Sequence, residues 1–182
     1  MNRRTAFFAL AISLAVGSSA ARAADANTVF LDTKDGRVTI ELRPDIAPKH
    51  VKQLKTLIAQ GFYNGLKFHR VMDGFMAQTG DPKGNGTGGS SLPDIPAEFS
   101  SAQFRRGTVG MARSSDPNSA NSQFFICLGD ASFLNGQYTV VGLVSDGMDV
   151  VDKIKRAAPG AAGGAVQNPD KIVKMQLAEK AK

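Results

Sequence analysis

Phe68-His69-Arg70-Val71-Met72-Asp73-Gly74-Phe75-Met76-Ala77-Gln78-Thr79-Gly80-Asp81 is the most informative segment of this chain. It predicts two short strands that meet at Asp73-Gly74, because this dipeptide favours tight hairpin turns. Alternation along a strand puts Phe75, Ala77 and Thr79 on one face, and Met76, Gln78 and Gly80 on the other. Before the turn, Phe68 shares a face with Arg70. The segment brings a cation, an amide and large apolar groups together without an obvious nucleophile, which suits holding and polarising an apolar ligand.

The flanking regions predict further short strands and two helices. Residues 28–33 and 37–42 flank Lys34-Asp35-Gly36, and the second segment alternates between apolar and polar residues, which is typical of a hairpin with one face in water. A helix is expected from Pro48 to near Gly61, with His50 at its surface or boundary. Strands are also expected at 108–112, 123–128, 138–144 and 171–177, and a second short helix at 148–156. Many short strands with two helices favour a mainly β barrel or sandwich with helical caps.

A long Gly-, Ser- and Pro-rich loop follows the first segment, at residues 80–96. Within it, Gly84-Asn85-Gly86-Thr87-Gly88-Gly89 matches the pattern G-x-G-x-x-G of dinucleotide-binding proteins. That motif must open a helix, whereas Ser90-Ser91-Leu92-Pro93 does not begin one. We therefore exclude a dinucleotide site and expect this loop to let its backbone approach a bound peptide.

The first 23 residues predict an export signal. Arg3 and Arg4 precede an apolar run at 6–16, and Ala21-Arg22-Ala23 is typical of a signal-peptide cleavage site. The run is too short to cross a membrane, although an N-terminal anchor helix is the alternative interpretation. We expect residues 1–23 to be removed and residues 24–182 to form one domain, periplasmic or secreted, without a linker or repeat.

Charge and cysteine content exclude several classes of function. The 22 basic and 16 acidic residues give a net charge of +6. Removing 1–23 takes away three arginines and no acid, which leaves 19 basic residues and a charge of +3. No run of Lys and Arg forms a nucleic-acid patch, so no nucleic-acid partner is expected. Cys127 is expected in a buried strand, and two His with one Cys form no metal-ligand motif.

Three blocks of sequence resemble one family. The first segment reads F-H-R-V-x-x-x-F-M-x-Q-x-G-D, residues 122–126 read S-Q-F-F-I, and residues 85–89 read N-G-T-G-G. These blocks, in their order along the chain, resemble the cyclophilins, which are peptidyl-prolyl cis–trans isomerases, and in particular exported bacterial members. The resemblance extends from Val29 to the C-terminus. It implies a closed eight-stranded antiparallel barrel capped by two α-helices, and an isomerase that needs neither cofactor nor metal.

The resemblance also implies a set of site residues. Arg70 would be the catalytic residue and donate a hydrogen bond toward the prolyl nitrogen, with Gln78 orienting it or binding substrate backbone. The remaining residues would bind the substrate: Phe75, Met76, Phe125 and Leu134 in a proline pocket, Gly86 and Gln123 along a peptide groove, Ala112 and Arg113 through backbone, and Phe133 and Tyr138 as aromatic walls. Phe133 stands where many eukaryotic members carry Trp, and Tyr138 where they carry His. Without the resemblance, Arg70 is an ordinary strand arginine in solvent and the apolar residues are ordinary core.

We therefore expect a monomeric isomerase that acts on proline-containing segments of exported proteins and assists their folding, with no membrane association after signal cleavage. An exported peptide-binding module or chaperone with little turnover is the alternative. A hydrolase is disfavoured, because the sequence offers no convincing Ser/His/Asp or paired-carboxylate arrangement.

Overall fold

The computed structural model describes residues 26–181 of the 182-residue chain. The predicted signal peptide, residues 1–23, lies outside the described residues. Strands and helices follow in the order β1 (Thr28–Thr33), β2 (Gly36–Leu42), α2 (Pro48–Ala59), β3 (Arg70–Met72), β4 (Met76–Thr79), β5 (Thr108–Met111), β6 (Phe124–Cys127), β7 (Val140–Asp146), α3 (Met148–Val151) and β8 (Lys174–Leu177). Short 3₁₀ turns lie at Ser132–Leu134, Ala162–Gly164 and Ala178–Lys180. Among the described residues, no helix is both long enough and apolar enough to cross a membrane.

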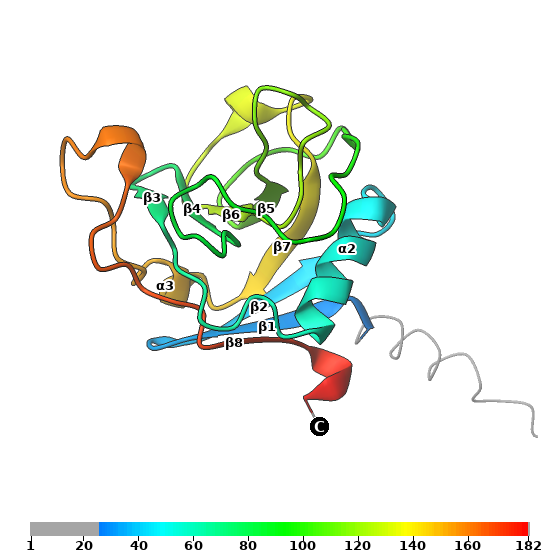
Figure 1. Ribbon diagram of the computed structural model, residues 1–182, viewed down its shortest axis with the longest axis horizontal. Coiled ribbons are helices and arrows are strands. Elements are labelled where there is room, and N and C mark those ends of the chain that lie inside the picture. Colours follow the sequence, from blue (N-terminus) through cyan, green and yellow to red (C-terminus); the bar gives the residue numbers. More distant parts are fainter. Residues whose placement is uncertain (1–25, 182) are drawn as a thin grey trace, which may run out of the picture.

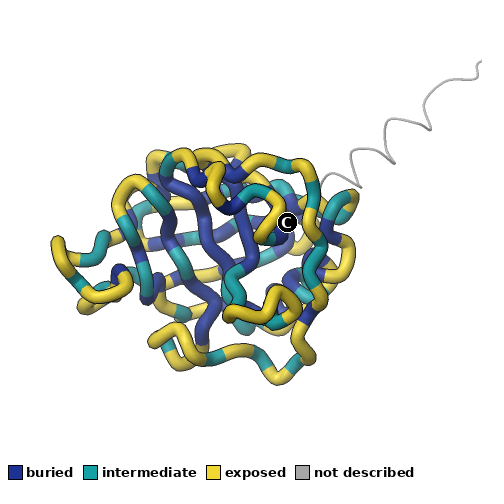
Figure 2. The backbone as a smooth tube through the Cα atoms, turned by 90° about the horizontal axis from the view of Figure 1, so that it is seen from above, coloured by how far each residue is buried: buried dark blue, intermediate teal, exposed yellow. Residues whose placement is uncertain are grey.

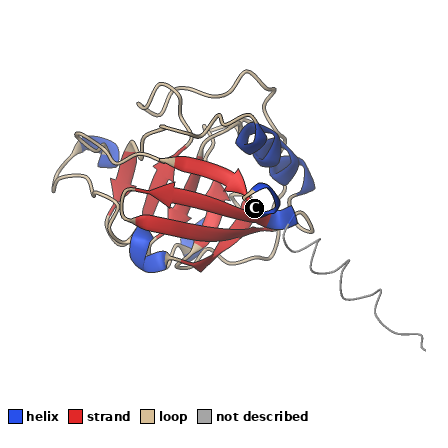
Figure 3. Cartoon of the chain, turned by 90° about the horizontal axis from the view of Figure 1, so that it is seen from below, coloured by secondary structure: helices blue, strands red, loops and turns tan. Residues whose placement is uncertain are grey.

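The strands form one antiparallel sheet of eight strands in the order β3-β4-β6-β5-β7-β2-β1-β8 (Figures 1 and 3). Its two edges are β3 and β8, so the sheet is an open half-barrel and the predicted closed barrel is wrong. Between these edges, the segments 65–70 and 165–172 share only isolated bridges, at Lys67–Lys171 and Arg70–Ala165. A continuous ladder is interrupted there because Pro169 has no N–H to donate and Asn168 has a φ of 50°.

The first segment forms β3, a turn and β4, as the sequence predicts. In the hairpin register Arg70 lies opposite Gln78, and Met72 lies opposite Met76. The prediction for Phe75 is wrong, however, because β4 begins only at Met76. Phe75 belongs to the turn, where its N–H donates to Met72 O at 3.1 Å. Strand alternation therefore does not apply to it, and Phe75 and Met76 line the same pocket.

Both predicted helices are present, with differences in detail. Helix α2 begins at Pro48 as expected, but His50 is fully buried rather than at the surface. The reason is tertiary. The connection between β4 and β5, which includes the long loop, crosses the start of α2 and places Glu98 Oε2 2.7 Å from His50 Nδ1. Helix α3 is four residues long and shorter than predicted, because the chain continues past Val151 with bonds from residue i to residue i+3.

The buried residues form two clusters. The larger one fills the space between the sheet and α2, and includes the fully buried Tyr63, Phe68 and Phe124. The smaller one consists of Met76, Phe104, Phe125, Cys127, Ala131, Leu134 and Val140. Figure 2 shows buried backbone concentrated along the strands and exposed backbone along the loops. The smaller cluster reaches the surface beside the first segment, and there it meets the candidate site.

Candidate active site

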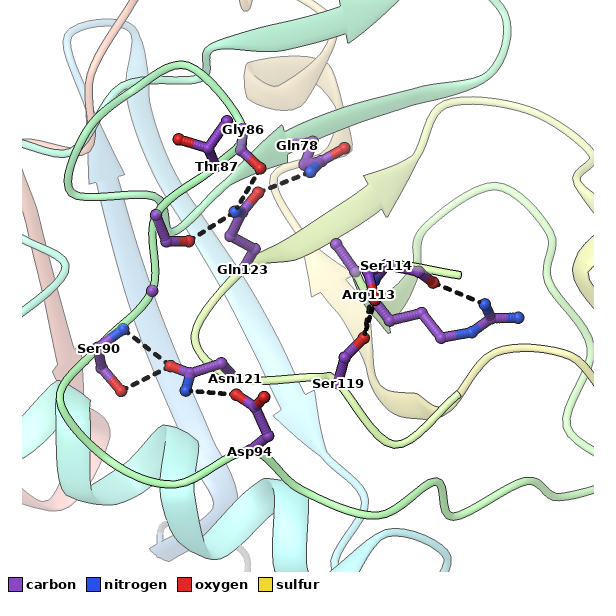
Figure 4. Close-up of a pocket in the computed structure, with 13 residues that line it drawn as sticks. Gln78, Gly86, Thr87, Ser90, Asp94, Arg113, Ser114, Ser119, Asn121 and Gln123 are labelled. Carbon is purple, nitrogen blue, oxygen red and sulfur yellow. Dashed lines mark hydrogen bonds between the residues drawn. The ribbon is translucent and has the colours of Figure 1, made fainter. Parts of the chain in front are cut away.

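Two adjoining depressions on one face gather all twelve residues that the sequence analysis assigned to the site. The first, of about 240 Å³, is lined by Arg70, Phe75, Met76, Gln78, Ala112, Arg113, Phe125, Phe133, Leu134 and Tyr138. The second, of about 420 Å³, is lined by Gly86 and Gln123 together with other residues of the Gly-rich loop and with Ala112, Arg113, Ser114, Ser119 and Asn121 (Figure 4). Both depressions share Gln78, Ala112 and Arg113. They therefore form one groove with an apolar end and a polar end.

The apolar end has a rigid floor. Met76 and Phe125 are 1% and 4% exposed, and both belong to the smaller core cluster. The Phe125 ring stacks on Phe104 with centroids 5.8 Å apart. Gly110 allows this stack, because a Cβ there would lie 2.5 Å from the Phe104 ring and 2.6 Å from the Phe125 ring. The sequence analysis missed both Phe104 and Gly110, since neither lies in a recognised block.

The walls of the apolar end are aromatic. Phe75 packs against Phe133 with ring centroids 5.2 Å apart, and Tyr138 meets Phe125 edge-on at 6.1 Å. Phe133 is 61% exposed and so forms the rim rather than the floor. The result is a pocket of about 240 Å³ with an apolar floor and aromatic walls.

Arg70 stands at the edge of this pocket with four partners. Its Nη1 donates to Gln78 Oε1 at 3.1 Å and lies 3.9 Å from Met76 Sδ. Its Nε donates to the carbonyl oxygen of Gly163 at 2.7 Å, and its Nη2 approaches Met72 Sδ at 3.2 Å. Burial lowers the pKa of the Arg70 guanidinium because desolvation penalises its charged form. An arginine nevertheless stays protonated in a protein, so the group is a partly desolvated cation beside an apolar pocket.

A chain of amide groups links Arg70 to the polar end. Gln78 Nε2 donates to Gln123 Oε1 at 2.8 Å. Gln123 Nε2 in turn donates to the carbonyl oxygens of Gly86 and Gly88, at 3.1 and 2.8 Å (Figure 4). Gln78 thus holds the Arg70 guanidinium, and Gln123 holds the Gly-rich loop. Because the two glutamines bond to each other, they fix the apolar and the polar end of the groove relative to one another.

Arg113 lies across the middle of the groove. Its guanidinium covers the Tyr138 ring at 4.3 Å and donates to Gln137 O at 2.9 Å. Ala112 donates its N–H to Gln123 O at 2.9 Å, so this N–H is already used within the protein. The side chain of Arg113 therefore braces the aromatic wall.

The Gly-rich loop is organised from beneath by a buried carboxylate. Asp81 is 1% exposed and accepts the backbone N–H groups of Lys83, Asn85 and Gly86 at 2.8, 3.0 and 2.6 Å. Burial alone would raise the pKa of Asp81, but these N–H donors outweigh it and hold the pKa below its usual value. His69 is buried under this loop, and desolvation lowers its pKa. Neither side chain lines the groove, in agreement with the structural role that we expected for His69.

Nucleophilic or metal chemistry finds little support here. Burial raises the pKa of the Cys127 thiol to about 12, which disfavours a reactive thiolate. Within residues 26–181, no group of three or more His, Cys, Asp or Glu side chains could hold a metal ion. The groove instead holds the Arg70 cation at the edge of an apolar pocket. Its polar end, lined by the Gly-rich loop, extends from that pocket.

Comparison with known proteins agrees with this geometry. Residues 28–177 match the family described as cyclophilin-type peptidyl-prolyl cis-trans isomerase. A probable peptidyl-prolyl cis-trans isomerase of Brucella suis is 59% identical over 179 residues, which cover 92% of this chain and 91% of the relative. A peptidyl-prolyl cis-trans isomerase of Acinetobacter baylyi is 41% identical over 84% of this chain and 86% of its own length.

Solved structures with this fold are also cyclophilins. A cyclophilin-type isomerase of Cryptosporidium parvum, crystallised in the presence of the dipeptide Ala-Pro, superimposes with a TM-score of 0.76 at 30% identity, over 82% of this chain and 98% of its own. A cyclophilin of Hirschia baltica superimposes with a TM-score of 0.73 at 26% identity, over 93% of this chain and 82% of its own.

Proposed function

The chain belongs to the cyclophilin-type peptidyl-prolyl cis–trans isomerases, and on that premise we propose how its groove rotates an X–Pro bond and which proteins supply the substrate. The proline ring enters the apolar pocket over Met76, Phe125 and Leu134, and the preceding residues extend toward Gln123 and the Gly-rich loop. Ala112 and Arg113 flank the peptide between the two ends, while Phe133 and Tyr138 close the pocket sideways. The observation that carries this proposal is the position of the Arg70 guanidinium at the edge of the apolar pocket.

Arg70 acts on the bond electronically. An X–Pro bond resists rotation because the nitrogen lone pair is shared with the carbonyl group. A hydrogen bond donated to that nitrogen favours the twisted state, in which the lone pair is localised, over the planar ground state. Each Nη atom of Arg70 carries two N–H bonds. Those of Nη1 face Gln78 and Met76, whereas Nη2 has Met72 as a partner for one of its two. The second N–H of Nη2 is thus available to the substrate.

The magnitudes require positioning as well as hydrogen bonding. A million-fold acceleration corresponds to roughly 8 kcal/mol. One hydrogen bond from a charged donor contributes about 1.5–3 kcal/mol. The rest must come from holding the ring and the peptide near the reactive geometry, which the rigid floor under the pocket favours.

Replacement of Arg70 by alanine tests this role. We expect kcat/KM on an X–Pro peptide to fall on the order of 10²-fold, as for removal of one donor aimed at a transition state. Arg70→Lys should be nearly as poor, because an ammonium group cannot reproduce the planar fork. The matched control is Arg37→Ala, which removes an exposed arginine paired with Asp32 on another part of the sheet. Wild-type turnover by a folded Arg70→Ala protein, checked by circular dichroism, would contradict the mechanism.

We also propose an exported isomerase that assists the folding of other exported proteins. The charged start, the apolar run and the cleavage site within residues 1–23 support export, most simply to the periplasm, and residues 24–182 would then act as a monomeric single domain. Uncatalysed X–Pro isomerisation takes tens to hundreds of seconds, so it limits folding. N-terminal sequencing of the protein from the periplasmic fraction should begin after Ala23, and an intact Arg3-Arg4 there would refute the proposal.

The alternative is a peptide-binding module with little turnover. The presence of Arg70, with its guanidinium fixed and directed along the pocket edge, favours catalysis. A protease-coupled or NMR exchange assay separates the two, because a mere binder retains affinity for the proline peptide without accelerating its isomerisation.

A further inference from the structure

The Gly- and Ala-rich segment at residues 157–166 lies against β3, the strand that carries Arg70. Ala157 N donates to Val71 O and Val166 N donates to His69 O, each at 3.0 Å. Ala165 also forms a bridge with Arg70 itself. Because β3 is an edge strand of the open sheet, both ends of the segment are fixed to the backbone on either side of Arg70. In Figure 1 this segment forms the orange loop beside β3.

The turn at Gly163 and Gly164 contacts the Nε atom and the aliphatic stem of the Arg70 side chain. Gly163 presents its carbonyl oxygen to Arg70 Nε at 2.7 Å. Gly164 is buried, and a Cβ built there would overlap Met72 Cγ and lie 3.6 Å from Arg70 Cγ. Met72 in turn brings its Sδ to within 3.2 Å of Arg70 Nη2. The absence of a side chain at 164 therefore lets the turn pack on both Met72 and the stem of Arg70.

Three contacts that do not lie on one line define the orientation of a planar guanidinium group. Gln78 holds Nη1 from the neighbouring strand, and Met72 Sδ lies beside Nη2. The Gly163 carbonyl holds Nε on the other side, so the plane is fixed and the remaining N–H bond of Nη2 acquires one direction. Errors of about 1 Å in the position of a catalytic group can cost on the order of 100-fold in rate.

We propose that the Gly163–Gly164 turn is a positioning element for catalysis, which sets the orientation of the Arg70 guanidinium toward the prolyl nitrogen. The inference rests on the proposed role of Arg70 and extends it to residues that lie 93 positions away in the sequence. The competing explanation is that the turn only covers the exposed edge of β3. In that case its shape matters for stability but not for turnover.

Two matched alanine substitutions distinguish these explanations. Gly160 and Gly164 both have a left-handed φ, of 79° and 78°, so alanine meets similar backbone strain at each. A Cβ at 160 meets nothing within 4 Å, whereas a Cβ at 164 displaces Met72 and the turn. For Gly164→Ala we expect kcat to fall roughly 10- to 100-fold with little change in KM, since only the transition state is affected. Gly160→Ala, in the same segment but without a contact to Arg70, should stay within a few-fold of the wild type.

A second-site variant keeps the test valid if Gly164→Ala is unstable. Met72→Ala removes the atom that the new Cβ would overlap, so Gly164→Ala should cost much less kcat in the Met72→Ala background than in the wild type. An additive loss in the double variant would overturn the proposal. Hydrogen exchange of the Arg70 Nε–H, followed by NMR, provides a readout without substrate. The exchange should be slow in the wild type and in Gly160→Ala, and faster in Gly164→Ala.

The outcomes separate this inference from the proposed function. If Arg70→Ala is inactive while Gly164→Ala and Gly160→Ala have equal kcat, the positioning role is refuted and the role of Arg70 stands. If Arg70→Ala is itself fully active, the mechanism fails and the inference fails with it. If, of the two glycine variants, only Gly164→Ala has a low kcat, and its Arg70 Nε–H exchanges fast, the result supports both the role of Arg70 and the positioning role of the turn.

Discussion

Glu98 holds the long loop to the start of α2, and its removal should destabilise the whole protein. Its side chain is 13% exposed. Its carboxylate accepts the backbone N–H groups of Lys49 and His50, both at 3.1 Å, and His50 Nδ1 at 2.7 Å. The residue at the usual cap position, Ala47, makes no side-chain cap bond. Glu98 thus caps this helix from 48 residues away.

The cost of Glu98→Ala follows from these contacts. Loss of a helix cap costs about 0.5–2 kcal/mol. Loss of a charged hydrogen-bond partner that leaves a buried imidazole unpaired costs a further 1.5–3 kcal/mol or so. The free energy of unfolding should therefore fall by roughly 2–5 kcal/mol, or about 4–20 °C in Tm for a domain of this size. Glu98→Gln retains one acceptor oxygen and should lose roughly half as much.

The same contacts predict the response to acid. Burial lowers the pKa of His50, although Glu98 opposes this. For Glu98, burial alone would raise the pKa, but hydrogen bonds from His50 and Lys49 hold it below its usual value. Both folded pKa values lie below the unfolded ones, so the unfolded chain binds more protons on acidification. The contribution of these two groups to the free energy of unfolding should thus be fully present above about pH 6.5. It should decrease first as His50 becomes protonated in the unfolded chain, and then, below about pH 4.3, as Glu98 does.

Urea unfolding at pH 7, 5.5 and 4, followed by circular dichroism, measures both effects. Between pH 7 and 5.5, Glu98→Gln should lose stability more steeply than the wild type, because its His50 no longer has a carboxylate that favours protonation. Glu179→Ala, which removes an exposed glutamate near the C-terminus, is the matched control. The reasoning is refuted if Glu98→Ala costs no more than Glu179→Ala, or if the stability of the wild type does not decrease between pH 7 and 4.

Two further predictions concern single side chains. Cys127 is fully buried with a pKa raised to about 12, so thiol reagents at pH 8 should label it only after unfolding; fast labelling of the native protein would contradict this. Phe133 stands where many eukaryotic cyclophilins carry a Trp whose indole N–H binds cyclosporin, and it is 61% exposed. Phe133→Trp should therefore tighten cyclosporin binding by the net value of one solvent-exposed hydrogen bond, about 0.5–1.5 kcal/mol or roughly two- to twelvefold, with little change in turnover; equal affinity of the parent and the variant in a titration would refute it.

The sequence by itself determined the local elements. The hairpin at β3 and β4, the hairpin at β1 and β2 and the start of α2 at Pro48 were all predicted, because alternation, turn dipeptides and helix-start residues act between near neighbours in the chain. The resemblance also named twelve site residues, and all twelve line the groove together with further residues. Seven of the twelve lie in the three blocks, on or beside β3, β4 and β6 and in the Gly-rich loop, and these strands pair directly with one another.

Only the tertiary structure decided which distant segments complete these elements. The carbonyl of Gly163 on Arg70, the cap that Glu98 provides for α2 and the Phe104 ring under Phe125 each join residues at least 20 positions apart. The opening of the sheet also depends on distant segments. Closure would need a continuous ladder between residues 65–70 and 165–172, and these segments form only isolated bridges. No local pattern encodes such contacts, because their free energy depends on the packing of the whole core and on loop closure rather than on the residues alone.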